Sequence, residues 1–308
     1  MQRWNKIVML AVLFTAGIAV QGQGNSNNLV TLFDSESFTL GQVTLPYRKA
    51  DICHDAAVKP ALVLYLHGGT SRGNDNEAQL KENAVGFIYQ YLHSRGIAAT
   101  LIVPQCPAGG GWTSQNRKVV NELLKSYVKD ETGDADRIYV MGGSMGGTGT
   151  WCQLSYFPDF YAAAMPVAGN PTGMNAENVA TTPVLTVMGT ADAMMSIQAV
   201  ETFQTAVLAA GGTLRLDTEE GWSHPTTCEQ SYTNERLDWL FSHVRGTETS
   251  IREVGAATHS SSLIYDLFGR PQSHPVRGIY IREGKKFIQK CFLEGTTTIL
   301  ARTLRPTL

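Results

Sequence analysis

The chain has 308 residues, of which 43% are hydrophobic and 17% are charged, and its formal net charge is -2 at pH 7. This length accommodates one large domain with a buried core, or one domain with a small appendage. The isoelectric point near 6.4 indicates no basic surface of the kind that nucleic acids require, so we expect no nucleic-acid partner.

Residues 1–22 have the pattern of a secretory signal peptide. Arg3 and Lys6 precede the apolar run "IVMLAVLFTAGIAV", and small residues surround a cleavage position near Gly22 or Gln23. A membrane anchor is the alternative, although the run is short for a spanning helix of about 20 residues. No cysteine lies near the cut, which disfavours a lipid anchor, and no later segment is apolar enough to span a bilayer. We therefore expect an exported protein with no membrane span after cleavage.

The region 23–245 is predicted to form one domain in which short apolar runs alternate with helical patterns. Predicted strands cover residues 61–68, 97–105, 137–143, 162–169, 184–192 and 214–220. Predicted helices cover residues 77–95, 115–129, 145–156, 196–210 and 227–244. This rhythm indicates a mostly parallel sheet flanked by helices, because continuous apolar runs are typical of strands buried on both faces. Ahead of it, "LVTLF" and "SFTLGQVTLPYRK" alternate like antiparallel edge strands.

The pattern changes after residue 245. Residues 246–262 are polar and without periodicity, which predicts a linker. Residues 263–308 hold two or three short strand-like runs broken by Gly and Pro, and this tail is too small for a core of its own. We expect a small β-type appendage there.

The five cysteines are an odd number and show no C-x-x-C spacing, so they predict no zinc or redox site. We expect buried free thiols, and one disulfide is the alternative, since export permits it. The cysteines are Cys53, Cys106, Cys152, Cys228 and Cys291.

A glycine-rich turn follows the predicted strand 137–143. Gly142, Ser144 and Gly146 form G-x-S-x-G between that strand and a predicted helix, the context of a nucleophile elbow. A serine there sits beside the helix N-terminus, where developing negative charge is favoured. A glycine-rich packing turn or a phosphate loop is the alternative, but the lysine of a phosphate loop is missing. The pattern predicts Ser144 as a nucleophile.

A serine nucleophile needs a base, and the base needs an acid to hold its tautomer. Asp192 closes the predicted strand 184–192, and His224 follows the last predicted strand, so both emerge at the same edge of the sheet as the serine. Asp217 is the rival acid, but it lies within a predicted strand. A purely structural Asp192 that caps its loop is the alternative.

Two backbone N–H groups are predicted to form an oxyanion hole, those of Gly69 in "LYLHGG" and of Met145 after the serine, with the His67 side chain orienting the turn. Trp112 and Trp222 also fall at the catalytic edge, where they are expected to contact the substrate, or else they are packing residues.

Four stretches together resemble one family. They are "LHGGTSRGNDNEAQL", "VPQCPAGGGW", "DADRIYVMGGSMGGTGTW" and "PDFYAAAMPVAGNP". With the spacing to Asp192 and His224, they are similar to secreted esterases and predicted peptidases of the α/β-hydrolase superfamily, in the branch with feruloyl esterases and polyhydroxybutyrate depolymerase-like enzymes. The resemblance covers residues 40–245 and implies an α/β-hydrolase fold with Ser144 as nucleophile. One departure is visible, because the family's acid lies in H-G-x-x-D-x-x-V-P, whereas this chain has "MGTADAMMS".

We expect a secreted serine hydrolase that cleaves carboxylic esters, such as feruloyl or acetyl esters of plant polysaccharide, without a metal or organic cofactor. The stretch between Ser144 and Asp192 is too short for a large lid, which predicts an open cleft. A serine peptidase with the same triad and a non-catalytic surface binding protein on a hydrolase scaffold are the alternatives.

The tail "IYDLFGRPQSHPVRGIYIREGKKFIQK" resembles the C-terminal sorting tails of exported proteins that use type IX secretion. The resemblance implies secretion machinery as a partner, and a secreted, periplasmic or cell-surface location in a gram-negative bacterium. Here the chain continues past "GKK" with "CFLEGTTTILARTLRPTL". A β appendage that packs on the hydrolase is the alternative.

Overall fold

The structure is a computed structural model, and it describes residues 26–55, 57–112 and 114–246, together with four short strands within 264–289. The predicted signal peptide lies outside the described residues, as does the predicted linker beyond Gly246. The chain divides into two compact units, residues 1–248 and residues 249–308.

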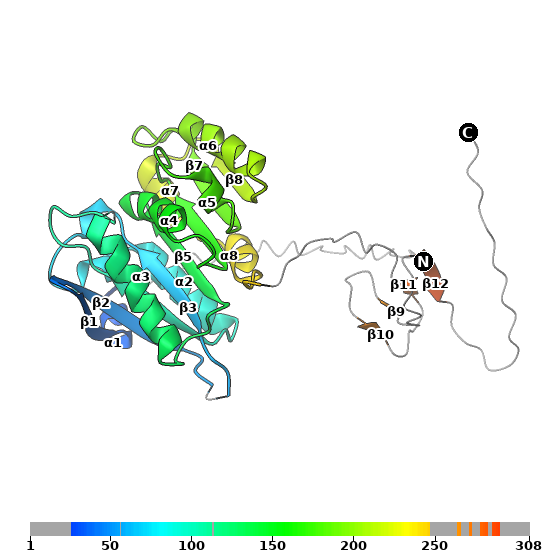
Figure 1. Ribbon diagram of the computed structural model, residues 1–308, viewed down its shortest axis with the longest axis horizontal. Helices are drawn as coiled ribbons and strands as arrows, with labels where there is room; N and C mark the ends of the chain where they lie inside the picture. The colour runs from blue at the N-terminus through cyan, green and yellow to red at the C-terminus, as the bar shows by residue number, and fades with distance from the viewer. Residues whose placement is uncertain are drawn as a thin grey trace, which may run out of the picture. The chain divides into compact units, whose positions relative to one another are not determined.

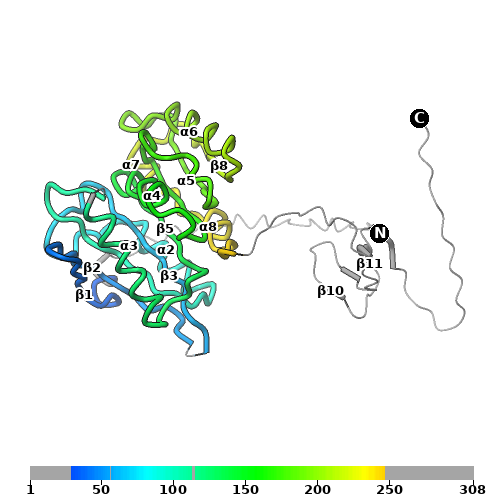
Figure 2. Tube along the Cα trace, in the orientation of Figure 1, coloured from blue at the N-terminus to red at the C-terminus, as the bar shows by residue number. Residues whose placement is uncertain are grey.

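An eight-stranded sheet in the order β1-β2-β4-β3-β5-β6-β7-β8 forms the centre of the first unit (Figure 1). The first two strands, β1 (Asp34–Leu40) and β2 (Val43–Ile52), are antiparallel to their neighbours. The parallel strands are β3 (Ala61–Leu66), β4 (Ala99–Pro104), β5 (Ile138–Gly143), β6 (Ala163–Val167), β7 (Val184–Gly189) and β8 (Leu214–Glu219). The predicted mostly parallel sheet is therefore confirmed, and Figure 2 shows β1 and β8 at its opposite edges.

Helices cover both faces of this sheet because its strands alternate their side chains between two apolar cores. Leu62 and Leu64 of β3 belong to one core, whereas Val63 and Tyr65 belong to the other. The first core lies under α3 (Ser114–Lys129), α4 (Met145–Tyr156), α5 (Ala176–Val179) and α6 (Ile197–Ala209). The second lies under α1 (Ser26–Leu32), α2 (Asn83–Ser94) and α8 (Asn234–Phe241).

The stretch "LVTLF" was expected to be an edge strand, and this prediction is wrong. It lies in and just after α1, and the Phe33 N–H donates to the Leu29 carbonyl over 3.1 Å. Leu29 and Phe33 are four residues apart, so one helical turn brings both side chains into the core beside α2. Burial of this pair outweighs the local β-type alternation.

Two predicted helices are each divided in the structure. The first begins as a 3₁₀ turn, η2 (Ala78–Lys81), and α2 starts only after the extended residue Glu82. The second becomes α7 (His224–Gln230) and α8, because the Thr233 side chain caps a new helix by accepting from the Arg236 N–H. His224 is thus the first residue of α7, and Ser223 caps it.

The described residues of the second unit form four short strands in the order β10-β9-β11-β12. They are β9 (Ile264–Tyr265), β10 (Pro271–Gln272), β11 (Gly278–Arg282) and β12 (Lys285–Gln289). β11 and β12 pair as an antiparallel hairpin. This is the small β-type appendage expected from the sequence.

The four cysteines in the described part of the chain are all free thiols, and Cys106 and Cys152 are buried as expected. Cys291 lies outside the described residues. Across the described ranges, no helix combines the length and the apolarity that crossing a membrane requires.

The division near residue 248 predicts that the first unit folds by itself. A chain of residues 23–246 retains the whole eight-stranded sheet and both apolar cores. We expect its melting temperature to lie within about 2 °C of that of residues 23–308, since ~1 kcal/mol corresponds to roughly 2–4 °C in a domain of this size. Differential scanning calorimetry of both chains measures this, and an insoluble short chain, or one that melts far lower, would show that the fold of the first unit requires the tail.

Candidate active site

Ser144 lies at the sharp turn between β5 and α4, with a φ of 57° and a ψ of -116°. This positive φ is unfavourable for a residue with a side chain, so the surrounding packing must hold it. A side chain on Gly142 or Gly146 would overlap the Leu66 carbonyl oxygen at the end of β3. The two glycines therefore let the turn pack against β3, which is the elbow geometry that the G-x-S-x-G pattern predicts.

Ser144, His224 and Asp192 form a continuous chain of hydrogen bonds. The Ser144 Oγ lies 2.8 Å from His224 Nε2, and His224 Nδ1 lies 2.8 Å from Asp192 Oδ2. The Asp192 side chain is fully buried and the His224 side chain is 9% exposed. Because the carboxylate accepts a hydrogen bond from the Nδ1–H group, the Nε2 lone pair faces the serine hydroxyl and is able to remove its proton. The structure brings together the three residues that the sequence placed in this order.

The Asp192 loop is held by its own backbone. Asp192 Oδ1 accepts the N–H groups of Met194 and Met195 over 2.8 and 2.9 Å, which leaves Oδ2 for the histidine. The Ala191 N–H donates to the Trp222 carbonyl over 3.1 Å, so the loop after β7 is tied to the loop that carries His224. The segment "MGTADAMMS" thus brings Asp192 within hydrogen-bond distance of His224, although it lacks the Val-Pro of the family pattern.

Asp217 does not approach the histidine. It forms ion pairs with Arg215 over 2.6 Å and with Arg236 over 2.9 Å. Burial by itself would raise the pKa of Asp217, but the hydrogen bonds from these two arginines hold that pKa below its usual range. Asp217 belongs to a charged cluster on β8.

The turn after β3 lies beside Ser144, because a Cβ added to Gly68 would be 3.8 Å from the Ser144 Cβ. The Gly68 carbonyl accepts from His67 Nδ1 over 2.6 Å and from the Ser71 N–H over 3.3 Å. In a trans peptide the C=O and N–H point in opposite directions, so the Gly69 N–H points away from these two donors. Within the described residues neither the Gly69 nor the Met145 N–H has a hydrogen-bond partner, so both are available to an oxyanion.

His67 is buried as a neutral imidazole. Its Nε2 accepts the Cys106 N–H over 2.9 Å, so the ring proton lies on Nδ1, which donates to the Gly68 carbonyl. Burial, with a smaller contribution from Arg72, lowers the pKa of His67 to about 4, although the bond to Gly68 opposes the shift. The ring orients the turn, as expected.

Trp112 was expected to be able to contact the substrate, and the structure contradicts this. Its side chain is 1% exposed, and its Nε1 donates to the His67 carbonyl over 2.9 Å. The indole and the imidazole of His67 meet edge to face with ring centroids 4.9 Å apart. Trp112 therefore supports the turn after β3 from inside the core.

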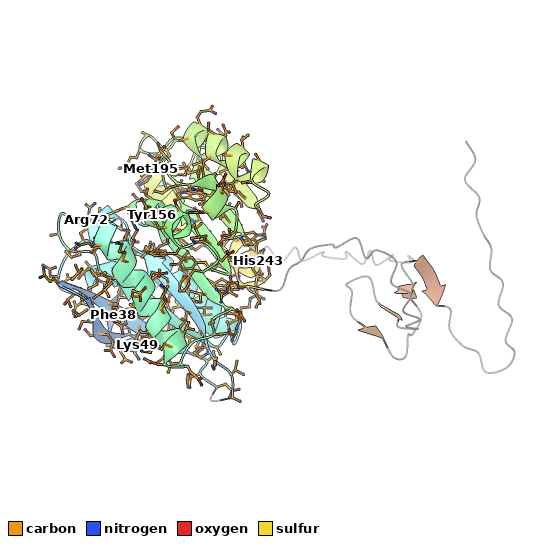
Figure 3. The ribbon with its side chains drawn as sticks, in the orientation of Figure 1. Phe38, Lys49, Arg72, Tyr156, Met195 and His243 are labelled. Atoms are coloured by element: carbon orange, nitrogen blue, oxygen red, sulfur yellow. The ribbon has the colours of Figure 1, made fainter. Side chains whose placement is uncertain are left out.

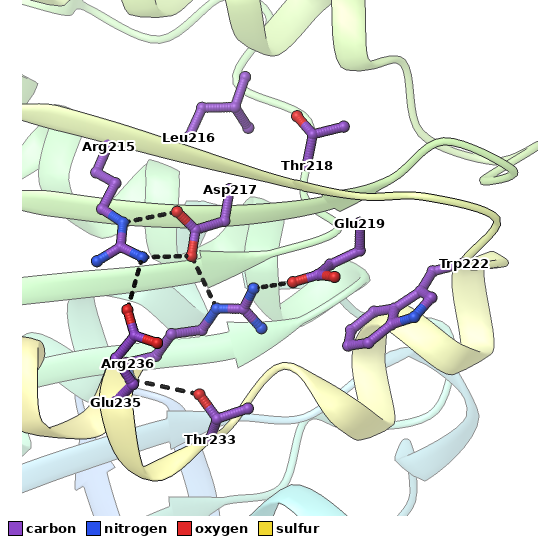
Figure 4. Close-up of a pocket in the computed structure, with 9 residues that line it drawn as sticks. All are labelled: Arg215, Leu216, Asp217, Thr218, Glu219, Trp222, Thr233, Glu235 and Arg236. Atoms are coloured by element: carbon purple, nitrogen blue, oxygen red, sulfur yellow. Dashed lines mark hydrogen bonds and ion pairs between the residues drawn. The ribbon is translucent and has the colours of Figure 1, made fainter.

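Trp222 is half-buried and lines a surface cavity of about 560 Å³ beside β8 (Figure 4). Charged residues make up most of the remaining wall. They are Arg215, Asp217, Glu219, Glu235 and Arg236. Of the two predicted tryptophans, only this one lies where a bound molecule could touch it.

Two methionines and a cysteine also lie near Ser144, His224 and Asp192. Met194 is 69% exposed, and Figure 3 shows its neighbour Met195 on the loop after β7. The Cys228 Sγ lies 4.0 Å from His224 Nε2. Burial, with the nearby carboxylates of Glu82 and Asp192, raises the pKa of Cys228 to about 12, so this thiol stays protonated and does not compete as a nucleophile.

Glu82, which was not predicted from the sequence, accepts three hydrogen bonds behind the turn after β3. Gln105 was not predicted either, and its side chain joins Ser71 and Asp75. The signal for Glu82 was the polar stretch "SRGNDNEAQLKE" shortly after the HGG turn, which Glu82 ends. In the described ranges no cluster of three or more His, Cys, Asp or Glu residues is suited to a metal ion.

Residues 108–242 match the Dienelactone hydrolase family. No protein of curated description matches the chain. Among solved structures, a thermostable esterase is 25% identical with a TM-score of 0.66, and the match covers 71% of this chain and 64% of the esterase.

Two further structures share the fold. A candidate dienelactone hydrolase from Klebsiella pneumoniae is 16% identical with a TM-score of 0.52. The match covers 68% of this chain and 98% of that hydrolase. An acylaminoacyl peptidase from Pyrococcus horikoshii is 14% identical with a TM-score of 0.53. The match covers 72% of this chain and 44% of the peptidase. The chain thus spans less than two thirds of the esterase and less than half of the peptidase. The family match and these neighbours support a hydrolase with the α/β-hydrolase fold.

The buried His67 predicts a loss of stability in acid. Its pKa is about 6.5 in the unfolded chain and about 4 in the folded one, so between these pH values the unfolded state binds more protons. We expect this residue alone to lower the free energy of unfolding by roughly 3 kcal/mol as the pH falls from 6.5 to 4. Urea unfolding of the wild type and of His67→Gln across that range measures the difference. The variant should lose less stability in acid than the wild type, and parallel losses would contradict the prediction.

Proposed function

We propose that this protein is a serine hydrolase that cleaves carboxylic esters, with Ser144 as nucleophile, His224 as base and Asp192 as the acid that orients it. The observation that carries the proposal is the hydrogen-bond chain from the Ser144 Oγ through His224 to the buried Asp192 carboxylate. A serine on a strained turn with such a partner is the arrangement that acyl transfer requires.

In the first half of the proposed reaction, the Ser144 Oγ forms a bond to the ester carbonyl carbon while its proton passes to His224 Nε2. The carbonyl oxygen becomes an oxyanion, and the Gly69 and Met145 N–H groups donate to it. The carbon–oxygen bond to the alcohol then breaks, and the alcohol leaves with the proton from Nε2. An acyl group remains on Ser144.

In the second half, water replaces the alcohol. His224 Nε2 takes a proton from the water as its oxygen attacks the acyl carbon, and the same two N–H groups hold the second oxyanion. The bond to the Ser144 Oγ then breaks, and that oxygen recovers its proton from Nε2. The carboxylic acid leaves and the starting state returns, so no metal or organic cofactor enters the cycle.

The proposed substrate is a feruloyl or acetyl ester of plant polysaccharide. The segment between β6 and β7 contains only α5 and short loops, and this supports an open site that admits a bulky substrate. Trp222 lies two residues before His224, and the cavity beside it is lined by charged groups. Such groups bind sugar hydroxyls better than alkyl chains, and the indole offers an aromatic face.

Export is also part of the proposal. The pattern of residues 1–22 supports a signal peptide, and the resemblance of the tail supports delivery by type IX secretion machinery in a gram-negative bacterium. Polysaccharide is too large to enter a cell intact, so an enzyme that removes its ester groups would act in the periplasm, at the cell surface or outside.

The proposed role of Ser144 predicts the behaviour of Ser144→Ala. We expect the variant to hydrolyse a small activated ester at least ~10³-fold more slowly, because it lacks the attacking oxygen. A fluorophosphonate probe should label the wild type at Ser144 and leave the variant unlabelled. Steady-state kinetics and peptide mapping by mass spectrometry measure both effects.

Ser196→Ala is a matched control, since Ser196 only caps α6. This control should keep its turnover and its labelling. Unchanged hydrolysis by Ser144→Ala, or labelling at another serine, would refute the assignment.

The proposed substrate class predicts an order of preference. We would compare methyl ferulate, an acetylated sugar, a long-chain nitrophenyl ester and a peptide anilide. One of the first two should exceed the peptide anilide in kcat/KM by at least ~10², because an amine leaves only if His224 protonates it well. Trp222→Ala should raise KM for the preferred ester and leave hydrolysis of nitrophenyl acetate unchanged.

A lead for the peptide anilide would favour the peptidase alternative while leaving the triad intact. A lead for the long-chain ester would contradict the open polar site. If Trp222→Ala changed neither substrate, the cavity beside β8 would have no part in binding.

A further inference from the structure

The carboxylate of Glu82 is close to the site but has no part in the proposed proton transfers. Glu82 is an extended residue between η2 and α2, and its half-buried side chain points under the turn after β3. Its Oε1 accepts the Gly68 N–H and the Ser71 Oγ–H, each over 2.7 Å. Its Oε2 accepts the Tyr65 hydroxyl over 2.6 Å.

These bonds hold both ends of the short 3₁₀ turn η1 (Gly69–Ser71) at a single oxygen atom. Gly68 directly precedes η1 and Ser71 ends it. The Gly68 carbonyl is fixed separately, by His67 and the Ser71 N–H. The two peptide units on either side of Gly68 are therefore both held, and the direction of the Gly69 N–H follows from them.

The position of the carboxylate is in turn set by the core. Tyr65 is 1% exposed on β3, and its ring meets Tyr232 edge to face at 5.8 Å. Burial raises the pKa of Glu82, although the bonds from Tyr65, Ser71 and Gly68 oppose this. A carboxyl group is costly to bury unless donors surround it, and here three donors do.

We propose that Glu82 is the positioning residue of the oxyanion hole, whose carboxylate fixes η1 so that the Gly69 N–H points at the developing oxyanion. This inference rests on the proposed function. Glu82 touches neither the substrate nor the reacting atoms, and it acts through Gly68 and Ser71. Its effect is confined to the transition state, since the ground-state ester has no oxyanion to bind.

Two single substitutions separate the effect of the length of the Glu82 side chain from the effect of its charge. Glu82→Asp keeps the charge, but its oxygens retreat by about 1.5 Å, one carbon–carbon bond. Glu82→Gln keeps the length and one acceptor oxygen for Gly68 and Ser71, and its amide faces the Tyr65 hydroxyl. We expect Glu82→Asp to lose ~10² in kcat with KM within about 3-fold, whereas Glu82→Gln stays within about 5-fold of the wild type, because a displacement near 1 Å costs about that much.

An alkyl boronic acid gives a second readout, since its adduct with Ser144 places a negative oxygen in the oxyanion hole. Its affinity should fall ~10² in Glu82→Asp and stay within about 5-fold in Glu82→Gln, in proportion to kcat. Thermal unfolding of each variant reports on folding independently. Asp238→Asn is the matched control, because Asp238 also accepts a tyrosine hydroxyl, that of Tyr91 over 2.8 Å, but lies on α8. It should leave kcat and boronate affinity unchanged.

Three results would overturn the inference. They are wild-type kcat in Glu82→Asp, a loss in Glu82→Gln as large as that in Glu82→Asp, and a lower kcat without weaker boronate binding. Ser144→Ala tests the proposed function separately. If that variant stays active, the proposed function fails, whereas if it is inactive while Glu82→Asp turns over normally, only the role of Glu82 fails.

Discussion

The contact between the β5–α4 turn and the end of β3 is the constraint on which the rest of the site depends. Neither Gly142 nor Gly146 tolerates a side chain there, because the Leu66 carbonyl oxygen occupies the space. In this close approach to β3, Ser144 adopts a positive φ, and the turn exposes its hydroxyl at the edge of the sheet. Since the HGG turn follows directly from β3, the same contact brings Gly68 beside the serine.

Three polar side chains, two buried and one half-buried, then support this contact. His67 is fixed as one neutral tautomer, the Asp192 carboxylate is divided between two backbone N–H groups and the imidazole, and Glu82 holds the 3₁₀ turn. Each group is costly to desolvate, and each has a hydrogen-bond partner. The complete arrangement is therefore rigid, and the loss of any one partner would leave a polar group unpaired and destabilise it. The low-dielectric surroundings of these groups also strengthen any charge interaction made near them.

The two tryptophans show how similar sequence positions can differ in role. Trp112 and Trp222 both occur in glycine-containing loops at the same edge of the sheet, and by sequence they are equivalent candidates for a substrate wall. Trp112 packs against the His67 ring and is enclosed by the core, while Trp222 is left partly exposed at the sheet's last strand. Which aromatic side chain stays accessible depends on whether a distant part of the chain covers it. The residues next to it in the sequence do not predict this.

The sequence by itself determined the alternation of parallel strands with helices, the sharp turn at Ser144 and the edge at which Asp192 and His224 emerge. These features depend on local periodicity, on glycine spacing and on parallel strand direction. Only the tertiary structure decided that "LVTLF" is helical, that Trp112 is buried and that Glu82 clamps the turn after β3. Those outcomes depend on contacts of α1 with the core beside α2, of Trp112 with His67 and of Glu82 with Gly68, each between residues more than ten positions apart. Burial and hydrogen bonding across such distances outweigh local preference, and they have no signature within a few residues of sequence.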